Sequence, residues 1–217
     1  MNKIVEHQTQ VPAPPGDPFS AYGAAASAGG TPFLKFVKGH FLYGVDEEEL
    51  PLGTRLVPHM SELRAGFVKW QAKEPVAEEM VLVADGVPAP ARESLGDTDE
   101  SLWETDAIGT PNDPWQITNH LPLKNPATGD EYIFVTGSKG GIGAIGRLCT
   151  NYGRAVDHRN AGRLPIIELG DKTYKHPNYG TVHTPIFPVV AWQDEARLVA
   201  SEEPKPADPE LDDEIPF

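Results

Sequence analysis

One stretch of this chain has the residue spacing of an amphipathic helix, and this restricts the fold more than any other feature. Its apolar residues recur at intervals of three and four, which places them on one side of an α-helix: Ile142, Ile145, Leu148, Cys149 and Tyr152. Elsewhere the apolar residues form short aromatic or alternating runs between turn residues, the pattern of β-strands. These runs are 33–38, 40–44, 54–58, 65–70, 79–84, 115–123, 132–136, 164–169 and 184–192. The sequence predicts a mainly β fold with one helix, on which Cys149 is a buried residue.

The two ends of the chain differ from its middle in composition. Residues 1–31 are rich in Ala, Gly, Pro and Ser, and residues 193–217 are acidic and contain several prolines. Both lack the apolar content that offsets the entropy cost of ordering. We expect a disordered N-terminal arm, one folded body over 32–192 and a disordered acidic tail. Within the body, residues 86–114 are acidic and poorly patterned, which predicts a long acidic loop.

The formal net charge of −14 opposes nucleic-acid binding, but the charges are segregated. Residues 76–115 hold ten acids and one base, and residues 193–217 hold nine acids and two bases. Residues 136–192 reverse the balance, with seven bases against three acids. The folded body can therefore carry a basic face despite the negative total charge.

Few other classes of protein fit the composition. No apolar run is long enough to span a membrane, and the N-terminus has no apolar signal region, so we expect a cytoplasmic protein. One cysteine excludes a disulfide framework or a cysteine-rich zinc site. The histidines have no recognisable metal-ligand spacing, and no nucleophile elbow or Walker A motif is present, so we expect no metal, no cofactor and no enzyme activity. The acids at 97–106 fit a solvated loop better than a cation site.

A glycine-rich segment precedes the helix. It contains Gly141-x-Gly143-x-x-Gly146 after an apolar strand. The Thr-Gly-x-x-x-Gly-Ile-Gly run around these glycines is similar to the cofactor loop of short-chain dehydrogenases. That family places the loop near the start of its domain and carries a Tyr-x-x-x-Lys pair, whereas Val156 stands four residues after Tyr152. The pattern therefore does not predict a nucleotide cofactor.

The same segment has a second interpretation. Its glycines leave backbone N–H groups open at a helix N-terminus, and Lys139 adds positive charge, which together suit a phosphate contact. A flexible glycine hairpin leading into a helix explains the residues equally well. Both interpretations stay open at this point.

A groove for single-stranded nucleic acid needs cations for phosphates and exposed aromatic rings for bases. Residues 33–43 interleave the two, although their alternating aromatics favour a core role. Residues 172–183 interleave them in a Gly/Pro/Asn-rich segment that we interpret as a loop. Arginines also lie off the apolar stripe of the helix. The candidate DNA-binding residues are Lys35, Lys38, Lys139, Arg147, Arg154, Lys172, Tyr174, Lys175 and Tyr179. The four tryptophans are expected to be packing residues.

The chain given ends in Leu211-Asp-Asp-Glu-Ile-Pro-Phe217, three acids followed by an apolar tip. Such a tip can place Phe217 in an apolar pocket, pair its carboxylate with a cation and steer the acids onto a basic rim. The heptapeptide resembles the C-terminal tip of the single-stranded DNA-binding (SSB) proteins of bacteria and phages. The candidate partner-binding residues are Asp212, Asp213, Glu214, Ile215, Pro216 and Phe217.

The resemblance covers the tip and the acidic, Pro-rich segment before it. It implies an OB-like barrel over 32–192 that binds single-stranded DNA with little sequence preference. It also implies a tail that recruits nucleases, helicases or other replication, recombination or repair proteins near the nucleoid, and it leaves a homo-oligomer open. The alternative, favoured by the net charge, is an adaptor or inhibitor that uses the tip to occupy the same host pockets without binding DNA.

Overall fold

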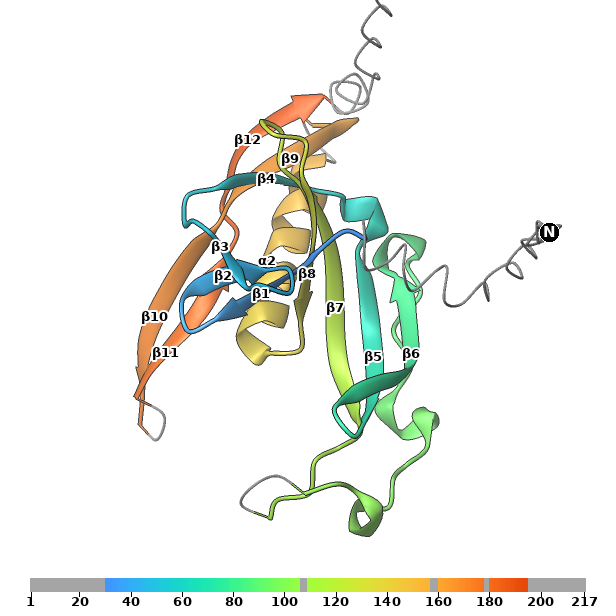
Figure 1. Cartoon of the computed structure of the whole chain (residues 1–217). Coiled ribbons are helices and arrows are strands. Elements are labelled where there is room, and N and C mark those ends of the chain that lie inside the picture. Colours follow the sequence, from blue (N-terminus) through green and yellow to red (C-terminus); the bar gives the residue numbers. More distant parts are fainter. Residues whose placement is uncertain (1–29, 106–108, 157–159, 178–179, 195–217) are drawn as a thin grey trace, which may run out of the picture. The chain divides into compact units, whose positions relative to one another are not determined.

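The computed structural model describes residues 30–105, 109–156, 160–177 and 180–194. By its contacts the chain divides into two units, Met1–Thr31 and Pro32–Phe217, and the second is described below. It is mainly β, and its large sheet curls strongly into a half-barrel around the single α-helix of the described residues, α2 (Lys139–Val156) (Figure 1). The prediction of a mainly β fold with one helix is confirmed, and the curl is consistent with the OB-like expectation.

The large sheet has the strand order β12-β9-β4-β7-β8-β1-β2-β3. Outside this order, β5 pairs with β7, and β6 pairs with β5. All its pairings are antiparallel except β1 with β8, where Phe33 lies opposite Ile133. A separate hairpin is formed by β10 and β11. The strands are β1 (Phe33–Val37), β2 (His40–Tyr43), β3 (Glu48–Leu50), β4 (Arg55–Pro58), β5 (Arg64–Gln71), β6 (Glu74–Leu82), β7 (Trp115–Lys124), β8 (Glu131–Thr136), β9 (Arg163–Glu168), β10 (Gly170–His176), β11 (Gly180–Ile186) and β12 (Val189–Asp194).

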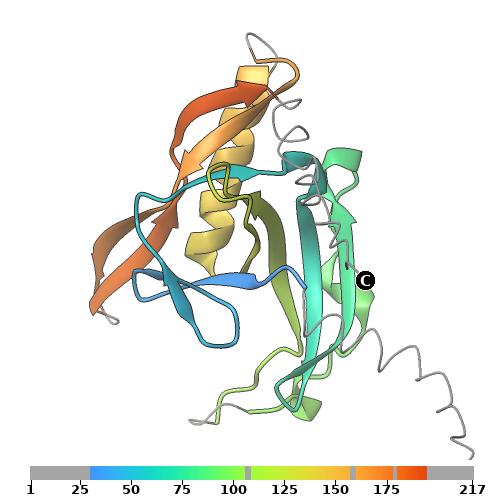
Figure 2. The ribbon, with the colours of Figure 1, turned by 45° about the horizontal axis from the view of Figure 1, so that its top comes forward.

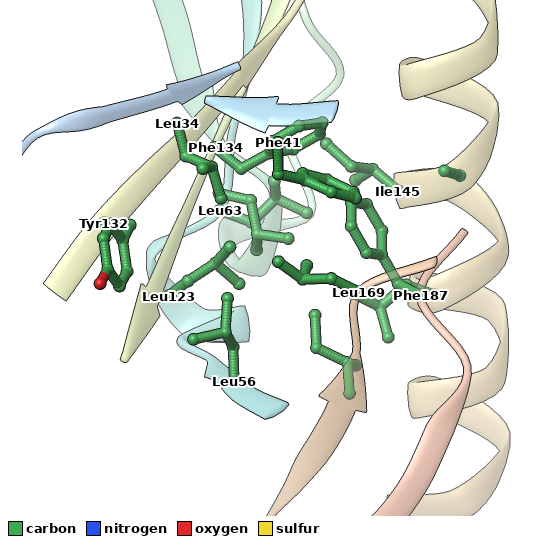
Figure 3. Close-up of a cluster of buried hydrophobic side chains, with 14 of the residues drawn as sticks. Leu34, Phe41, Leu56, Leu63, Leu123, Tyr132, Phe134, Ile145, Leu169 and Phe187 are labelled. Carbon is green, nitrogen blue, oxygen red and sulfur yellow. The ribbon is translucent and has the colours of Figure 1, made fainter. Parts of the chain in front are cut away.

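The core lies between α2 and the concave face of the sheet. Ile145 and Leu148 of the helix are buried in it with Leu34 of β1 (Figure 3). The rings of Phe134 and Phe187 meet edge to face with centroids 5.2 Å apart. Burying a side chain of this size stabilises the fold by about 1.5–3 kcal/mol, so the apolar stripe of α2 fixes the helix against the sheet.

The start of α2 is specified locally. The Ser138 hydroxyl accepts a hydrogen bond from the Gly141 N–H at 3.0 Å, which caps one of the free donors of the first turn. A Cβ at Gly141 would lie 2.0 Å from the Thr136 Oγ1, so only glycine fits where the helix leaves β8. The glycine at this position is therefore explained by packing.

Three segments differ from the sequence-based predictions. The single run expected at 184–192 is two strands, the end of β11 and β12, and β3 was not predicted. The interpretation of 172–183 as a loop was wrong, because these residues belong to the β10–β11 hairpin, with Lys172 opposite Thr184. The sequence did not indicate this hairpin because both faces of β10 carry mainly polar residues, so no alternation of apolar and polar residues is present. The described part of the acidic stretch 86–114 contains no strand and two short 3-10 helices, η3 (Arg92–Leu95) and η4 (Glu100–Leu102). Of the other two, η2 (Val83–Asp85) lies just before this stretch and η1 (Met60–Glu62) precedes β5.

Candidate nucleic-acid interface

The lysines and arginines of the described residues fall into two groups. One group forms ion pairs within 4 Å: Lys35, Arg55, Lys69, Arg92, Lys124 and Arg163. The other group has no carboxylate partner in the described part of the chain: Lys38, Arg64, Lys73, Lys139, Arg147, Arg154, Lys172 and Lys175. Most of this second group lies on α2, on β10 and at the β1–β2 turn, and these cations are candidate phosphate ligands.

The solvent face of α2 carries positive charge and no acid. Arg147 and Arg154 are exposed and seven residues apart, so they lie on one side of the helix about 10 Å apart along its axis. A shallow groove of about 360 Å³ follows this side and is lined by Gly143, Gly146, Arg147, Thr150 and Asn151. The helix thus presents a basic ridge beside a strip of bare backbone.

The β10–β11 hairpin meets the N-terminal turn of α2 at Thr184. A Cβ at Gly140 would lie 3.1 Å from the Thr184 Cγ2, so helix and hairpin touch there (Figures 1 and 2). Lys172 is opposite Thr184, and Tyr174 is two residues further along β10, so both project from the face of the hairpin that meets the helix. Tyr174 is 51% exposed. The hairpin therefore adds a cation and a free aromatic ring beside Lys139.

The other face of the hairpin packs on the β1–β2 turn. That turn consists of Lys38 and Gly39, both with positive φ, and a Cβ at Gly39 would lie 2.7 Å from the His183 Nδ1. His183 in turn lies 2.5 Å from the Asp171 carboxylate. The turn therefore places Lys38 beside the hairpin, on the side opposite to the one that meets α2.

Lys35 is separated from that face. It alternates with the buried Leu34 and so projects from the side of β1 away from the core and α2. Its ammonium group lies 2.5 Å from the Glu47 carboxylate. Nearby, the Tyr43 hydroxyl donates to Glu48 at 2.5 Å, and this hydrogen bond raises the pKa of Tyr43 to about 12. Glu47 and Glu48, at the β2–β3 turn and the start of β3, thus bind the Lys35 ammonium group and the Tyr43 hydroxyl.

The acids near the basic face are already paired. Glu168 contacts Arg55 at 3.6 Å, Asp194 contacts Arg163 at 3.1 Å, and Asp171 contacts His183. Because Glu168 and Asp194 each have an arginine partner, they offset little of the charge of Lys139, Arg147 and Lys172. The segregation of charge along the sequence thus continues in space.

Gly146 belongs to the segment that the sequence offered as a phosphate contact, and the structure places it on the exposed side of α2. Glycine costs about 1 kcal/mol relative to alanine inside a helix. Gly140 and Gly141 are required by close contacts, but a Cβ at Gly146 or Gly153 would meet no atom within 4 Å. No packing contact in the fold requires glycine at Gly146 or Gly153. Gly146 lines the groove, so close approach of a ligand to the helix backbone would explain the absence of a side chain there.

Two sets of predicted residues fall outside the described residues: Tyr179, and the tip Asp212, Asp213, Glu214, Ile215, Pro216 and Phe217. No group of three or more His, Cys, Asp or Glu side chains in the described ranges is placed to hold a metal ion. Nor is any helix in those ranges long and apolar enough to cross a membrane.

No known family model matches this chain. No curated protein and no solved structure matches it either. The assignment of a function therefore rests on the residues themselves.

Proposed function

We propose that the protein binds single-stranded DNA on the face formed by α2 and the side of the β10–β11 hairpin that meets it, and recruits DNA-processing proteins through its acidic tip. The observation that carries the proposal is the gathering, on α2 and the hairpin, of cations that have no carboxylate partner among the described residues, whereas most other lysines and arginines in those residues form ion pairs. Phosphate neutralisation needs such cations. The SSB-like tip supports the same assignment independently.

The parts of this face suit different parts of a DNA strand. Lys139, Arg147 and Arg154 follow the helix axis and suit successive phosphates, and the groove at Gly146 lets a sugar–phosphate backbone approach closely. Tyr174 offers a ring for base stacking, which is worth about 1–3 kcal/mol per base and tolerates any sequence. Such a face would bind strands by backbone and stacking contacts, with little sequence preference.

Titration of the full chain with fluorescent oligo(dT) at about 50 mM and about 200 mM NaCl tests the proposal. We expect salt-sensitive binding, and the triple variant K139A/R147A/K172A should lower the slope of log K against log salt by about 2, since each single-strand phosphate contact contributes about 0.7. The matched control is K35A/R55A/K69A, which removes three cations already paired with acids. Absence of binding at the lower salt concentration would refute strand binding.

The tip has its own test. Deletion of residues 211–217 should abolish the capture of DNA-processing proteins that recognise SSB-type tips and leave oligo(dT) binding unweakened. A loss of strand affinity on this deletion would contradict the proposed division of labour. A scrambled tip of the same composition is the control, because it keeps the charge and loses the order of residues.

The alternative function is an adaptor or inhibitor that carries the tip and does not bind DNA. The net charge of −14 favours it, since the whole molecule repels polyanions. The two functions share the tip and differ in the oligo(dT) titration, so that measurement separates them.

A further inference from the structure

A hollow lined by exposed aromatic and apolar side chains lies between the end of the β5–β6 hairpin and η4. It has a volume of about 390 Å³. Trp70 at the end of β5 is 38% exposed, Leu102 of η4 is 82% exposed, and Trp103 lines the wall beside it. A second hollow, of about 340 Å³, lies on the other side of Trp70 and Glu104. Tryptophan is enriched at the centres of protein-binding surfaces, and exposed apolar patches mark such surfaces.

The walls of this hollow are held in place by a polar network. The Arg92 guanidinium donates to both oxygens of Asp113 at 2.7 Å and to the carbonyls of Gly96 and Asp97. The Trp103 indole N–H donates to the Asp97 carbonyl at 2.7 Å. Asp97 is bound in turn to Lys69 of β5 and to the Trp115 indole N–H of β7, each at 2.9 Å. The loop that carries η4, which has no buried residue of its own, therefore presents a preformed surface.

The hollow is electronegative. Asp97, Asp99 and Glu104 line it, and its one cation, Lys69, already pairs with Asp97 at 2.9 Å. Asp99 caps η4 through the Ser101 N–H, and Glu104 accepts the Ala72 N–H at 3.0 Å. Within the described residues neither of these two carboxylates has a cationic partner. The charge excludes a nucleic acid and the acidic tail of this chain as occupants.

We propose that this hollow docks a basic segment of a partner protein by taking an arginine side chain between the indole of Trp70 and the carboxylates of Asp99 and Glu104. A guanidinium stacks on an indole face and pairs with carboxylates through several N–H groups at once, so arginine fits this combination better than lysine. Leu102 supplies an apolar contact for a residue next to the arginine. The surface is separate from the basic face and independent of DNA binding.

The test uses the full chain and the fluorescein-labelled peptide Gly-Arg-Leu-Arg-Gly-Arg-Leu-Gly, with binding followed by fluorescence anisotropy. A second peptide carries lysine in place of each arginine. The double variant D99N/E104Q keeps the hydrogen bonds to Ser101 and Ala72 and removes two charges. The control D85N/E93Q makes the same charge change at η2 and η3, outside the hollow.

We expect the arginine peptide to bind more tightly than the lysine peptide. D99N/E104Q should weaken its binding about tenfold, W70A about fivefold, and D85N/E93Q less than about twofold. Equal affinity of the two peptides, or equal effects of the two double variants, would overturn the proposal, because either result indicates charge attraction without a specific site. If W70A does not fold, as judged by thermal unfolding, the paired double variants still decide. The outcome is independent of the oligo(dT) titration of the full chain and of K139A/R147A/K172A, none of whose substituted residues lines this hollow.

Discussion

Replacing Gly146 by alanine should stabilise the protein and weaken DNA binding at the same time. A Cβ at this position meets no atom within 4 Å, so the methyl group enters open space. Alanine is favoured over glycine inside a helix by about 0.8–1.0 kcal/mol. We expect the free energy of unfolding to rise by that amount and Tm to rise by about 2–4 °C.

The same methyl group would stand in the groove between Gly143 and Thr150. If a DNA backbone lies against the helix there, the methyl group displaces it, and a loss of about 1 kcal/mol of contact raises Kd for oligo(dT) about fivefold. Denaturation by urea and fluorescence titration with oligo(dT) measure the two effects on the same preparation. A more stable protein that binds its ligand less well distinguishes this mechanism from damage to the fold.

Gly153→Ala is the matched control. Gly153 lies on the same helix, has equally open space and does not line the groove. It should give the same gain in stability with no change in Kd. Two results would refute the reasoning: destabilisation by Gly146→Ala, or equal binding by the two variants.

Two further predictions concern stability. Burial lowers the pKa of His120, and the charge of Arg64 lowers it further while that of Glu78 raises it. The unfolded chain therefore binds a proton more readily than the folded one. The free energy of unfolding should fall as the pH drops below about 6.5. Urea denaturation at about pH 7.5 and pH 5.5 should show a smaller fall for H120Q, and an unchanged fall would contradict this assignment. Arg92→Ala removes charge-assisted hydrogen bonds from a half-buried guanidinium and should cost about 2 kcal/mol, with faster hydrogen exchange over η3 and η4. The control Arg55→Ala removes an exposed ion pair and should lower the free energy of unfolding by less than about 1 kcal/mol. Similar losses of stability for the two variants would show that the Arg92 network does not order the loop.

The sequence was most informative where side chains repeat with a period. The stripe from Ile142 to Tyr152 identified α2, and alternating runs identified most strands of the large sheet. β10 was missed because neither of its faces is apolar, so its strand character comes from pairing with β11 and not from burial. The parallel pairing of β1 with β8 was also out of reach, since no local pattern specifies which strands meet.

The candidate site was predictable in part, for a similar reason. Residue types suggested Lys139, Arg147 and Lys172, but only the fold shows that these cations lack acidic partners among the described residues while Lys35 has one. The open space beside Gly146 is likewise invisible in a sequence, where a glycine needed for packing and a glycine without a packing role are the same letter. The hollow at Trp70 depends on a loop whose anchor, Arg92, pairs with an acid 21 residues away.

The parallel contact between β1 and β8 also sets the order in which this protein can assemble on the ribosome. Phe33 must wait for Ile133, which is made 100 residues later. At about 5–20 residues per second, the N-terminal hairpin of β1 and β2 stays without its neighbour for roughly 5–20 s. During that interval Leu34 and Phe41, fully buried in the finished protein, are exposed to the cell. The nascent chain is therefore expected to be a chaperone client at least until β8 emerges, and β1 is paired on both sides only when the middle of the chain returns to its beginning.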